Sequence, residues 1–323
     1  MPLPPFVGIF QTAAELGLIS SITVLALFLS YSMLNICDLS TDGCFALGAA
    51  VGAMVAISSG NPLLSILAAM LAGVLSGFVT AFLQTKMGIN SLLSGIIVNT
   101  GLYSIIMLIM GGRPTLNMNN TDTYFTPFKM LLDKTPFAGL YKTLGALVAV
   151  TLVIVFLSLF LRTRLGLAIR ATGNNPAMVR SSSINPAFTT TVGLCISGSL
   201  TALSGCLLAQ CQKSVSSDIG SGRVTIALAS LLIGGIFISA RRKIPFRAIG
   251  AVLGAIIFQL VYAIALRFNM PAYMLKLVSA VIVILAIATP YLNSKRPDLV
   301  RRFKARRNGT PEVPANDGGG SNA

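Results

Sequence analysis

Long apolar runs, each about as long as a bilayer core is thick, restrict the fold of this 323-residue chain more than any other feature. About 20 helical residues cross such a core. With 54% hydrophobic and 10% charged residues and a mean hydropathy of +0.81, the composition lies far from that of a soluble domain. We therefore expect an all-α polytopic membrane helix bundle. The pattern predicts about nine transmembrane helices, between eight and ten: 16–36, from 43 onward, 62–84, 91–110, 140–161, 188–210, 224–240, 249–266 and 272–292.

The distribution of basic residues predicts which side of the membrane each loop faces. Lys and Arg collect in short cytoplasmic loops, and the segment 162–187 carries four arginines and no acid. If this segment is cytoplasmic, nine spans place the N-terminus outside and the C-terminus inside. Sixteen of the 24 basic residues then lie in the cytoplasm: Lys86, Arg162, Arg164, Arg170, Arg180, Arg241, Arg242, Lys243, Arg247, Lys295, Arg296, Arg301, Arg302, Lys304, Arg306 and Arg307.

The chain divides into a transmembrane domain, residues 1–292, and a tail, residues 293–323. The tail begins with a basic cluster suited to anionic lipid headgroups and ends in a run rich in Gly, Asn and Pro, so we expect a cytoplasmic tail whose end is disordered. No basic patch is interleaved with aromatic residues, which argues against a nucleic-acid partner. The five cysteines lack metal-ligand spacing and the chain has no histidine, so no metal site is predicted. The start of the chain lacks the basic region of a cleavable signal peptide, and we expect the first apolar run to remain in the mature protein.

The basic segment is predicted to contain two short helices. Apolar and small residues recur at about 3.6-residue spacing over 165–172, and Gly173 and Asn174 then break the pattern. Asn175 is a suitable N-cap for a second helix, and Pro176 fits its first position. We expect that helix to present three side chains to the cytosol: Met178, Val179 and Arg180. A loop whose arginines only set the topology and touch lipid headgroups is the alternative.

A polar interruption follows the first predicted span. Asp38 and Asp42 break the apolar sequence, Ser40 and Thr41 are residue types that cap helices, and a new apolar run begins at Gly43. One interpretation is an ordinary loop before a capped helix. The other is a broken helix whose N-terminal end opens inside the membrane, as transporters use to face their substrates.

Two stretches resemble a known family. The run ATGNNPAMVR, followed by SINP, and the run DLSTDGCFALGA are similar to segments of permease subunits in the branched-chain amino acid, ribose and nucleoside class of ABC importers, and the Met-Val-Arg variant looks most like the subgroup of tryptophan-type uptake permeases. In that family the first run is a cytoplasmic coupling loop, here residues 162–187, whose short helix docks on the ATP-hydrolysing subunit. Ser183 departs from the family, which usually has Gly there; a positive φ would strain serine by very roughly 1 kcal/mol. The resemblance assigns ATPase contact to Gly173, Asn174, Asn175, Pro176, Met178, Val179 and Arg180.

The resemblance implies the transmembrane subunit of an ATP-driven importer in a bacterial inner (plasma) membrane. Implied partners are cytoplasmic ATPase subunits, a second permease copy and an extracytoplasmic substrate-binding protein. The implied substrate is an amino acid or similar small solute, with a sugar or nucleoside as an alternative. The chain contains no Gly-Lys dipeptide and therefore no Walker A loop. We expect no enzyme activity and no cofactor of its own, with ATP and Mg²⁺ bound by the partner ATPase.

A gradient-driven secondary transporter is the further alternative. Such carriers usually hold ionisable groups within their helices to bind the coupling ion. Only Glu15, Asp38 and Asp42 could serve here, because most of the apolar sequence contains no acid and there is no histidine. This scarcity of ionisable groups argues against a carrier driven by an ion gradient.

The translocation pathway is predicted to be lined by Asp42, Asn99 and Gln259. Asn99 and Gln259 lie within predicted spans, where an amide is costly unless it faces water or a partner helix. A helix-to-helix hydrogen bond is the alternative for each amide. We expect Asp42 to cap the broken helix, and the backbone N–H groups of Gly43 and Cys44 to contact the carboxylate of an amino-acid-like substrate.

Overall fold

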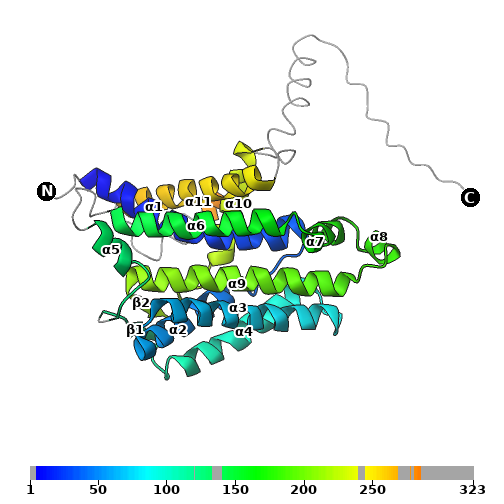
Figure 1. Ribbon diagram of the computed structural model, residues 1–323, viewed down its shortest axis with the longest axis horizontal. Helices are drawn as coiled ribbons and strands as arrows, with labels where there is room; N and C mark the ends of the chain where they lie inside the picture. Colours follow the sequence, from blue (N-terminus) through cyan, green and yellow to red (C-terminus); the bar gives the residue numbers. More distant parts are fainter. Residues whose placement is uncertain are drawn as a thin grey trace, which may run out of the picture.

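The computed structural model describes residues 5–119, 121–132, 140–238 and 244–267, together with residue 277 and residues 280–284. Its long helices lie side by side along one axis (Figure 1), which confirms the predicted all-α bundle. In chain order the elements are α1 (Pro5–Leu27), the π-helical η1 (Phe28–Met33), α2 (Thr41–Ser59), α3 (Pro62–Thr85), α4 (Ser91–Ile109), β1 (Thr115–Asn117), α5 (Thr126–Leu132), α6 (Tyr141–Phe160), α7 (Arg164–Asn174), α8 (Pro176–Ser181), α9 (Pro186–Gln212), β2 (Ser214–Ser216), α10 (Arg223–Phe237) and α11 (Ile244–Arg267).

Seven helices within the described residues are long and apolar enough to cross a bilayer. Each coincides with a predicted span, so the polytopic membrane architecture is confirmed. The seven are Phe10–Met33, Thr41–Ser59, Pro62–Thr85, Ser91–Ile109, Tyr141–Phe160, Pro186–Gln212 and Ile244–Ala265.

α10 is shorter than the sequence predicts. The apolar run 224–240 predicts a full span, whereas α10 has 15 residues. At about 1.5 Å per residue it is about 22 Å long, less than the roughly 30 Å of a hydrocarbon core. Its first turn lies beside Asp42, so the helix begins inside the bundle and not at its end. The predicted span 272–292 lies outside the described residues except for 277 and 280–284, and the tail 293–323 lies outside them entirely.

α9 packs against α1, α2 and α3. On its α3 side the two backbones approach so closely that a Cβ atom at Gly73 would collide with the carbonyl oxygen of Gly198. Small residues allow membrane helices this close approach. On its α1 side the hydroxyl of Ser204 donates to the carbonyl oxygen of Ile19 at 2.7 Å. α9 therefore fixes α1 and α3 relative to each other.

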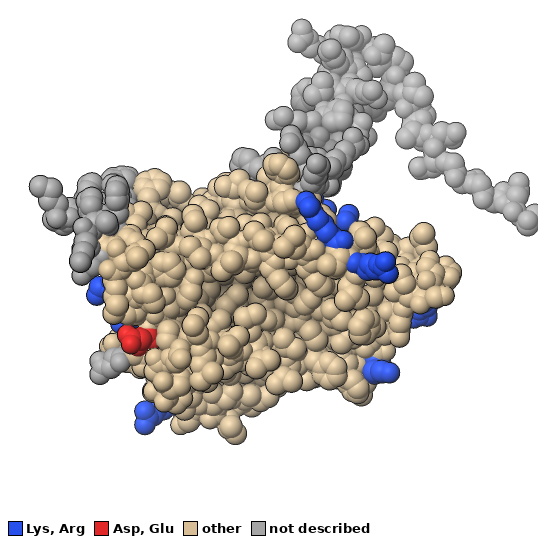
Figure 2. Space-filling view, viewed as in Figure 1, with Lys and Arg blue, Asp and Glu red and all other residues tan. Residues whose placement is uncertain are grey.

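The outer face of α3 carries an apolar stripe. Leu63, Leu67, Leu71 and Leu75 recur every fourth residue, and each is more than half exposed. A stripe of this kind is suited to lipid or to another apolar surface. Figure 2 agrees with a membrane location, because Lys, Arg, Asp and Glu lie toward the edges of the visible face and its centre is formed by other residues.

The two ends of the bundle carry different elements. α7 and α8 lie at one end, and α5, β1 and β2 lie at the other (Figure 1). β1 and β2 pair antiparallel with Leu116 opposite Val215, and the backbone N–H of Ser217 donates to the carbonyl oxygen of Pro114 at 3.0 Å. This sheet joins the loop that follows α4 to the chain that leads into α10.

Candidate functional site

The second helix of the basic segment 162–187 has the predicted cap. The side-chain oxygen of Asn175 accepts the backbone N–H groups of Ala177 (3.1 Å) and Met178 (3.2 Å), and Pro176 occupies the first position of α8. Because the cap holds the first turn, a helix of only six residues stands at the end of the bundle. Met178 is 67% exposed at its surface.

The burial of Val179 contradicts the prediction that three consecutive side chains face the cytosol. Its side chain is only 3% exposed, so α8 buries Val179 while Met178 and Arg180 stay on the outside. A helix of one and a half turns must rest on one face, and Val179 is its apolar anchor. Gly173 is half-buried, and the remaining predicted contact residues are exposed: Asn174, Asn175 and Pro176.

Ser183 ends α8 in a left-handed conformation. Its φ is 60°. The sequence raised the possibility of a positive φ here, because the family that the segment resembles usually has Gly at this position. The backbone N–H of Ile184 reaches back to the carbonyl oxygen of Val179 at 3.2 Å, as in a helix end closed by a left-handed residue. Serine therefore occupies a position that glycine adopts without strain.

The first helix of the basic segment 162–187 touches the end of the first span. A Cβ atom at Gly173 would collide with the carbonyl oxygen of Met33, and it would lie 2.9 Å from the Cα atom of Leu34. The hydroxyls of Thr172 and Thr189 lie 2.8 Å apart and tie α7 to α9. α7 is thus held directly against the last residues of η1.

The chain leaves its helical path immediately after η1. The backbone N–H of Ile36 donates to the carbonyl oxygen of Ser30 at 3.0 Å, and Asn35 has a φ of 56°. Asp38 then organises the break, because its Oδ1 accepts the N–H (2.9 Å) and the hydroxyl (2.6 Å) of Ser40. Asp38 is buried, so the sequence between η1 and α2 is a fixed connection.

This break lies within the bundle and not at its end. Leu39 packs against Gly95, and Gly43 packs against Asn99. These partners stand four and eight residues beyond Ser91, where α4 begins, which corresponds to about 6 Å and 12 Å along that helix. Of the two interpretations of the polar interruption, the structure supports the broken helix.

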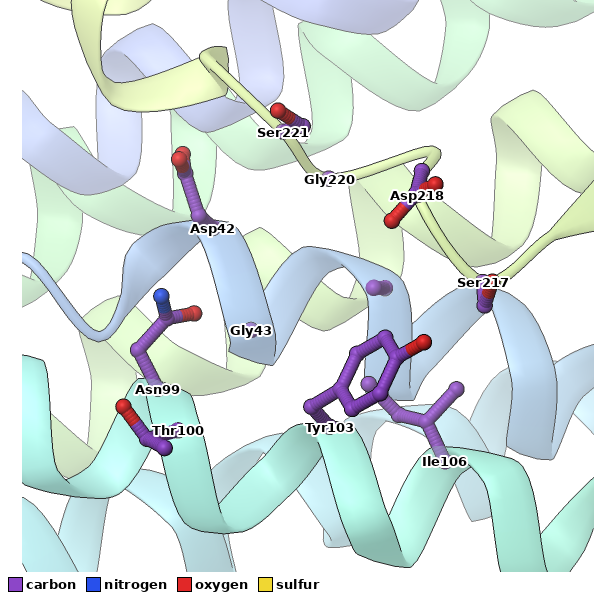
Figure 3. Close-up of a pocket in the computed structure, with 11 residues that line it drawn as sticks. Asp42, Gly43, Asn99, Thr100, Tyr103, Ile106, Ser217, Asp218, Gly220 and Ser221 are labelled. Carbon is purple, nitrogen blue, oxygen red and sulfur yellow. The ribbon is translucent and has the colours of Figure 1, made fainter.

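A polar cavity of about 340 Å³ opens at the start of α2 (Figure 3). It brings together three of the five predicted pathway residues, Asp42, Gly43 and Asn99. The remaining lining residues come from α2, from α4 and from the loop before α10: Ala46, Thr100, Tyr103, Ile106, Ser217, Asp218, Gly220 and Ser221. The cavity therefore lies where α2 and α4 meet a loop that is distant from them in the sequence.

Asp42 caps a different helix from the one predicted. Its Oδ2 accepts the backbone N–H of Gly222 (3.0 Å) and its Oδ1 accepts that of Val224 (2.7 Å), so it closes the N-terminus of α10. α2 itself begins after Ser40 without a side-chain cap. The residue before α10 is Gly222, which has no side chain to accept the first N–H groups of the helix. The carboxylate of Asp42 supplies these acceptors, together with the negative charge that a helix N-terminus favours.

Arg223 lies behind Asp42. Its Nε donates to the carbonyl oxygen of Ile219 at 3.1 Å, and its guanidinium carbon is 4.6 Å from the centroid of the Phe45 ring. Arg223 does not line the cavity.

Cys44 and Gln259 do not belong to this cavity. The N–H of Cys44 already donates to the carbonyl oxygen of Ser40 at 2.9 Å, and its Sγ lies 3.2 Å from the carbonyl oxygen of Gly198. The predicted anion contact by this N–H is therefore wrong, because the helix uses it. Gln259 is buried on α11 beside Gly17 of α1 and is not among the residues that line the cavity.

The loop before α10 was not predicted to contribute to the site. One signal was present, because Asp218-Ile219-Gly220-Ser221 repeats the order of an acid, an aliphatic residue and two small residues in Asp38-Leu39-Ser40-Thr41. Both stretches lead into a helix that begins inside the bundle. Within the described residues no group of three His, Cys, Asp or Glu side chains is placed to hold a metal ion.

Comparisons with known proteins agree with this architecture. Residues 9–287 match the family described as "Branched-chain amino acid transport system / permease component". The chain is 33% identical over 288 residues to the tyrosine transport system permease protein of Clostridioides difficile (strain R20291), which covers 88% of this chain and 92% of that relative. It is 26% identical over 254 residues to the ribose import permease protein RbsC of Escherichia coli (strain K12), which covers 77% and 75%. No solved structure matches the chain. The chain belongs to the permease family of the branched-chain amino acid and ribose class of ABC transporters.

Proposed function

We propose that this chain is the transmembrane subunit of an ATP-driven importer in a bacterial inner membrane, with ATP and Mg²⁺ bound by separate cytoplasmic subunits. The observation that carries the proposal is the coupling loop. α8 is a capped helix that exposes Met178 at the end of the bundle, and the preceding helix packs at Gly173 against the first span. This arrangement suits a partner subunit that binds α8 and thereby displaces α7.

A continuous series of contacts leads from the coupling loop to the cavity. α7 touches Met33, the break that follows is held by Asp38, and the next helix begins with the cavity residues Asp42 and Gly43. Close-packed interiors transmit displacements because they hold few voids to absorb them. A shift of α7 would therefore alter the opening between α2 and α10.

We propose that α8 faces the cytoplasm, with the N-terminus outside and the C-terminus inside. The support is the excess of Lys and Arg assigned to that side by the sequence. The opposite end, which carries α5, β1 and β2 (Figure 1), is then the surface on which an extracytoplasmic substrate-binding protein would dock.

A second copy of the permease is proposed to cover the exposed face of α4. Thr100, Tyr103 and Ser104 are exposed there next to the cavity. Polar groups at membrane depth are costly against lipid, whereas a neighbouring copy would enclose the cavity between two chains.

An amino acid or similar small solute is the substrate that we favour. The support is the relative named as a tyrosine permease, which is more similar over a larger share of the chain than the ribose permease. A sugar is the second candidate, and the named ribose permease supports it.

The function is tested by solute uptake into vesicles that contain the permease with its ATPase. We expect uptake to require internal ATP and a loaded binding protein, and to persist when an ionophore removes ion gradients. Met178→Asp should abolish uptake while the protein stays inserted and folded, because Met178 is an exposed residue. Uptake that needs an ion gradient and no ATP would establish the secondary transporter instead.

A further inference from the structure

The charges around the cavity are unbalanced. Two carboxylates line it, Asp42 and Asp218, and no Lys or Arg is among the lining residues. Both oxygens of Asp42 accept backbone N–H groups of α10, and Arg223 lies behind it. The negative charge of Asp42 is therefore largely balanced by groups of the protein itself.

Asp218 is placed differently. Its carboxylate is exposed in the cavity and has no ion pair within the described part of the chain. Its backbone carbonyl oxygen accepts the N–H of Ser221 at 3.0 Å, which shapes the turn, so the side chain is not needed for that purpose. In Figure 3 this side chain extends from the loop toward the space between Asp42 and Tyr103.

The opposite wall is formed by α4. Tyr103 is 51% exposed and its ring borders the cavity across from Asp218 (Figure 3). The hydroxyl of Thr100 donates to the carbonyl oxygen of Ile96 at 2.9 Å and is used within α4. An aromatic face and a carboxylate on two sides of one cavity are both favourable neighbours for a cationic group.

We propose that the cavity accepts the ammonium group of its solute, with Asp218 as the counter-ion and Tyr103 as the aromatic wall. The proposal deepens the proposed function, because it restricts the transported class to solutes that carry an amine and disfavours net anions and neutral sugars. A cleft with charge of one sign and low-dielectric walls concentrates ions of the opposite sign by about 10-fold to 1,000-fold. Asp218 supplies the uncompensated part of that field.

The test measures the field directly and needs neither ATP nor a binding protein. Cys37 and Cys195, the described cysteines that are not buried, are replaced by Ala, and Ser221→Cys places one thiol in the cavity. The full-length chain in washed membranes is treated with a cationic trimethylammonium thiosulfonate reagent or with its anionic sulfonate analogue. Each rate is divided by the rate of the same reagent with a free small thiol.

We expect the cationic reagent to react at least about 10-fold faster than the anionic one. Asp218→Asn should reduce this ratio to below about 3-fold, and Asp218→Glu should retain it. Asp122→Asn is the matched control, because Asp122 is exposed outside the cavity. Thr100→Cys on the opposite wall gives an independent reading if the loop does not tolerate a cysteine.

Equal rates for the two reagents, or a ratio that Asp218→Asn leaves unchanged, would overturn the proposal. The reagents could show a preference for cations that depends on Asp218 while uptake proves independent of ATP. That result would contradict the proposed function and support this inference. The two failures are therefore distinguishable.

Discussion

The carboxylate of Asp42 in α2 accepts the backbone N–H of Gly222, 180 residues away in the sequence, and so connects α2 with the start of α10. An acid at the start of a new apolar run is readily interpreted as a cap for its own helix. Its actual partners are the N–H groups of Gly222 and Val224, which lie beside it only after the chain has folded. The predicted residue was therefore part of the site, while its role depended on tertiary contacts that no local pattern contains.

Asp42→Asn should destabilise the start of α10. The substitution replaces one acceptor oxygen by an NH₂ group that opposes a backbone N–H, so we expect the free energy of unfolding to fall by about 1 to 3 kcal/mol. Thermal unfolding in detergent, with hydrogen exchange at Val224, measures the change. Asp122→Asn, at an exposed acid, should have little effect, and equal protection of Val224 in both variants would contradict the assignment.

Ser183→Gly should stabilise the end of α8. At a φ of 60° a serine side chain is strained and glycine is not, so we expect a gain of about 0.5 to 1 kcal/mol. Exchange of the Ile184 amide, which bonds back to Val179, should slow by about 2-fold to 5-fold. Ser182→Gly is the matched control, because Ser182 has a φ of −89° and should lose stability. Faster exchange in the Ser183 variant would argue against the left-handed cap.

At the scale of elements, the segment 162–187 packs directly against the end of the broken first span. Gly173 of α7 abuts Met33 at the end of η1, and the break that follows leads into α2. The helices themselves were predictable because caps and apolar spacing are local: Asn175 accepts the bonds that its position suggests. The burial of Val179 and the short length of α10 were not, because each depends on a neighbouring element.

Gly173→Ala should uncouple transport from ATP hydrolysis. The added methyl group would collide with the Met33 carbonyl oxygen, and either α7 or η1 must shift because backbone atoms cannot yield cheaply. We expect at least about threefold more ATP hydrolysed per solute moved. Ala171→Ser adds an atom on the exposed side of the same helix and serves as the control. An unchanged ratio in the Gly173 variant would show that this contact does not transmit the motion.

At the scale of the molecule, two helices begin inside the bundle and meet at one cavity. α2 begins at the cavity after the break, and the loop between β2 and α10 lines the cavity from the other side. The N–H groups of Gly222 and Val224 bond to Asp42, and that of Cys44 bonds to Ser40, so these helix starts are closed within the protein. Hydropathy predicted the spans, whereas the cavity required the pairing of β1 with β2, which joins segments about 100 residues apart.

The orientation has its own test. Single cysteines at Asn119 and Asn175 lie at opposite ends of the bundle and are both exposed, so an impermeant thiol reagent added to intact cells should label only one of them. The excess of basic residues predicts labelling at 119 and none at 175 until the membrane is opened. The reverse pattern would overturn the assignment of sides, and with it the cytoplasmic position of α8.

Contact between α8 and an ATPase is the central claim, and site-specific cross-linking tests it most directly. A photoreactive residue in place of Met178, which is 67% exposed, is activated in intact cells, and the captured protein is identified by mass spectrometry. The account predicts capture of a protein that carries a Walker A loop, and no such capture from the same residue placed at Asn119. Efficient capture of lipid alone at position 178, or equal capture of the ATPase from position 119, would contradict it.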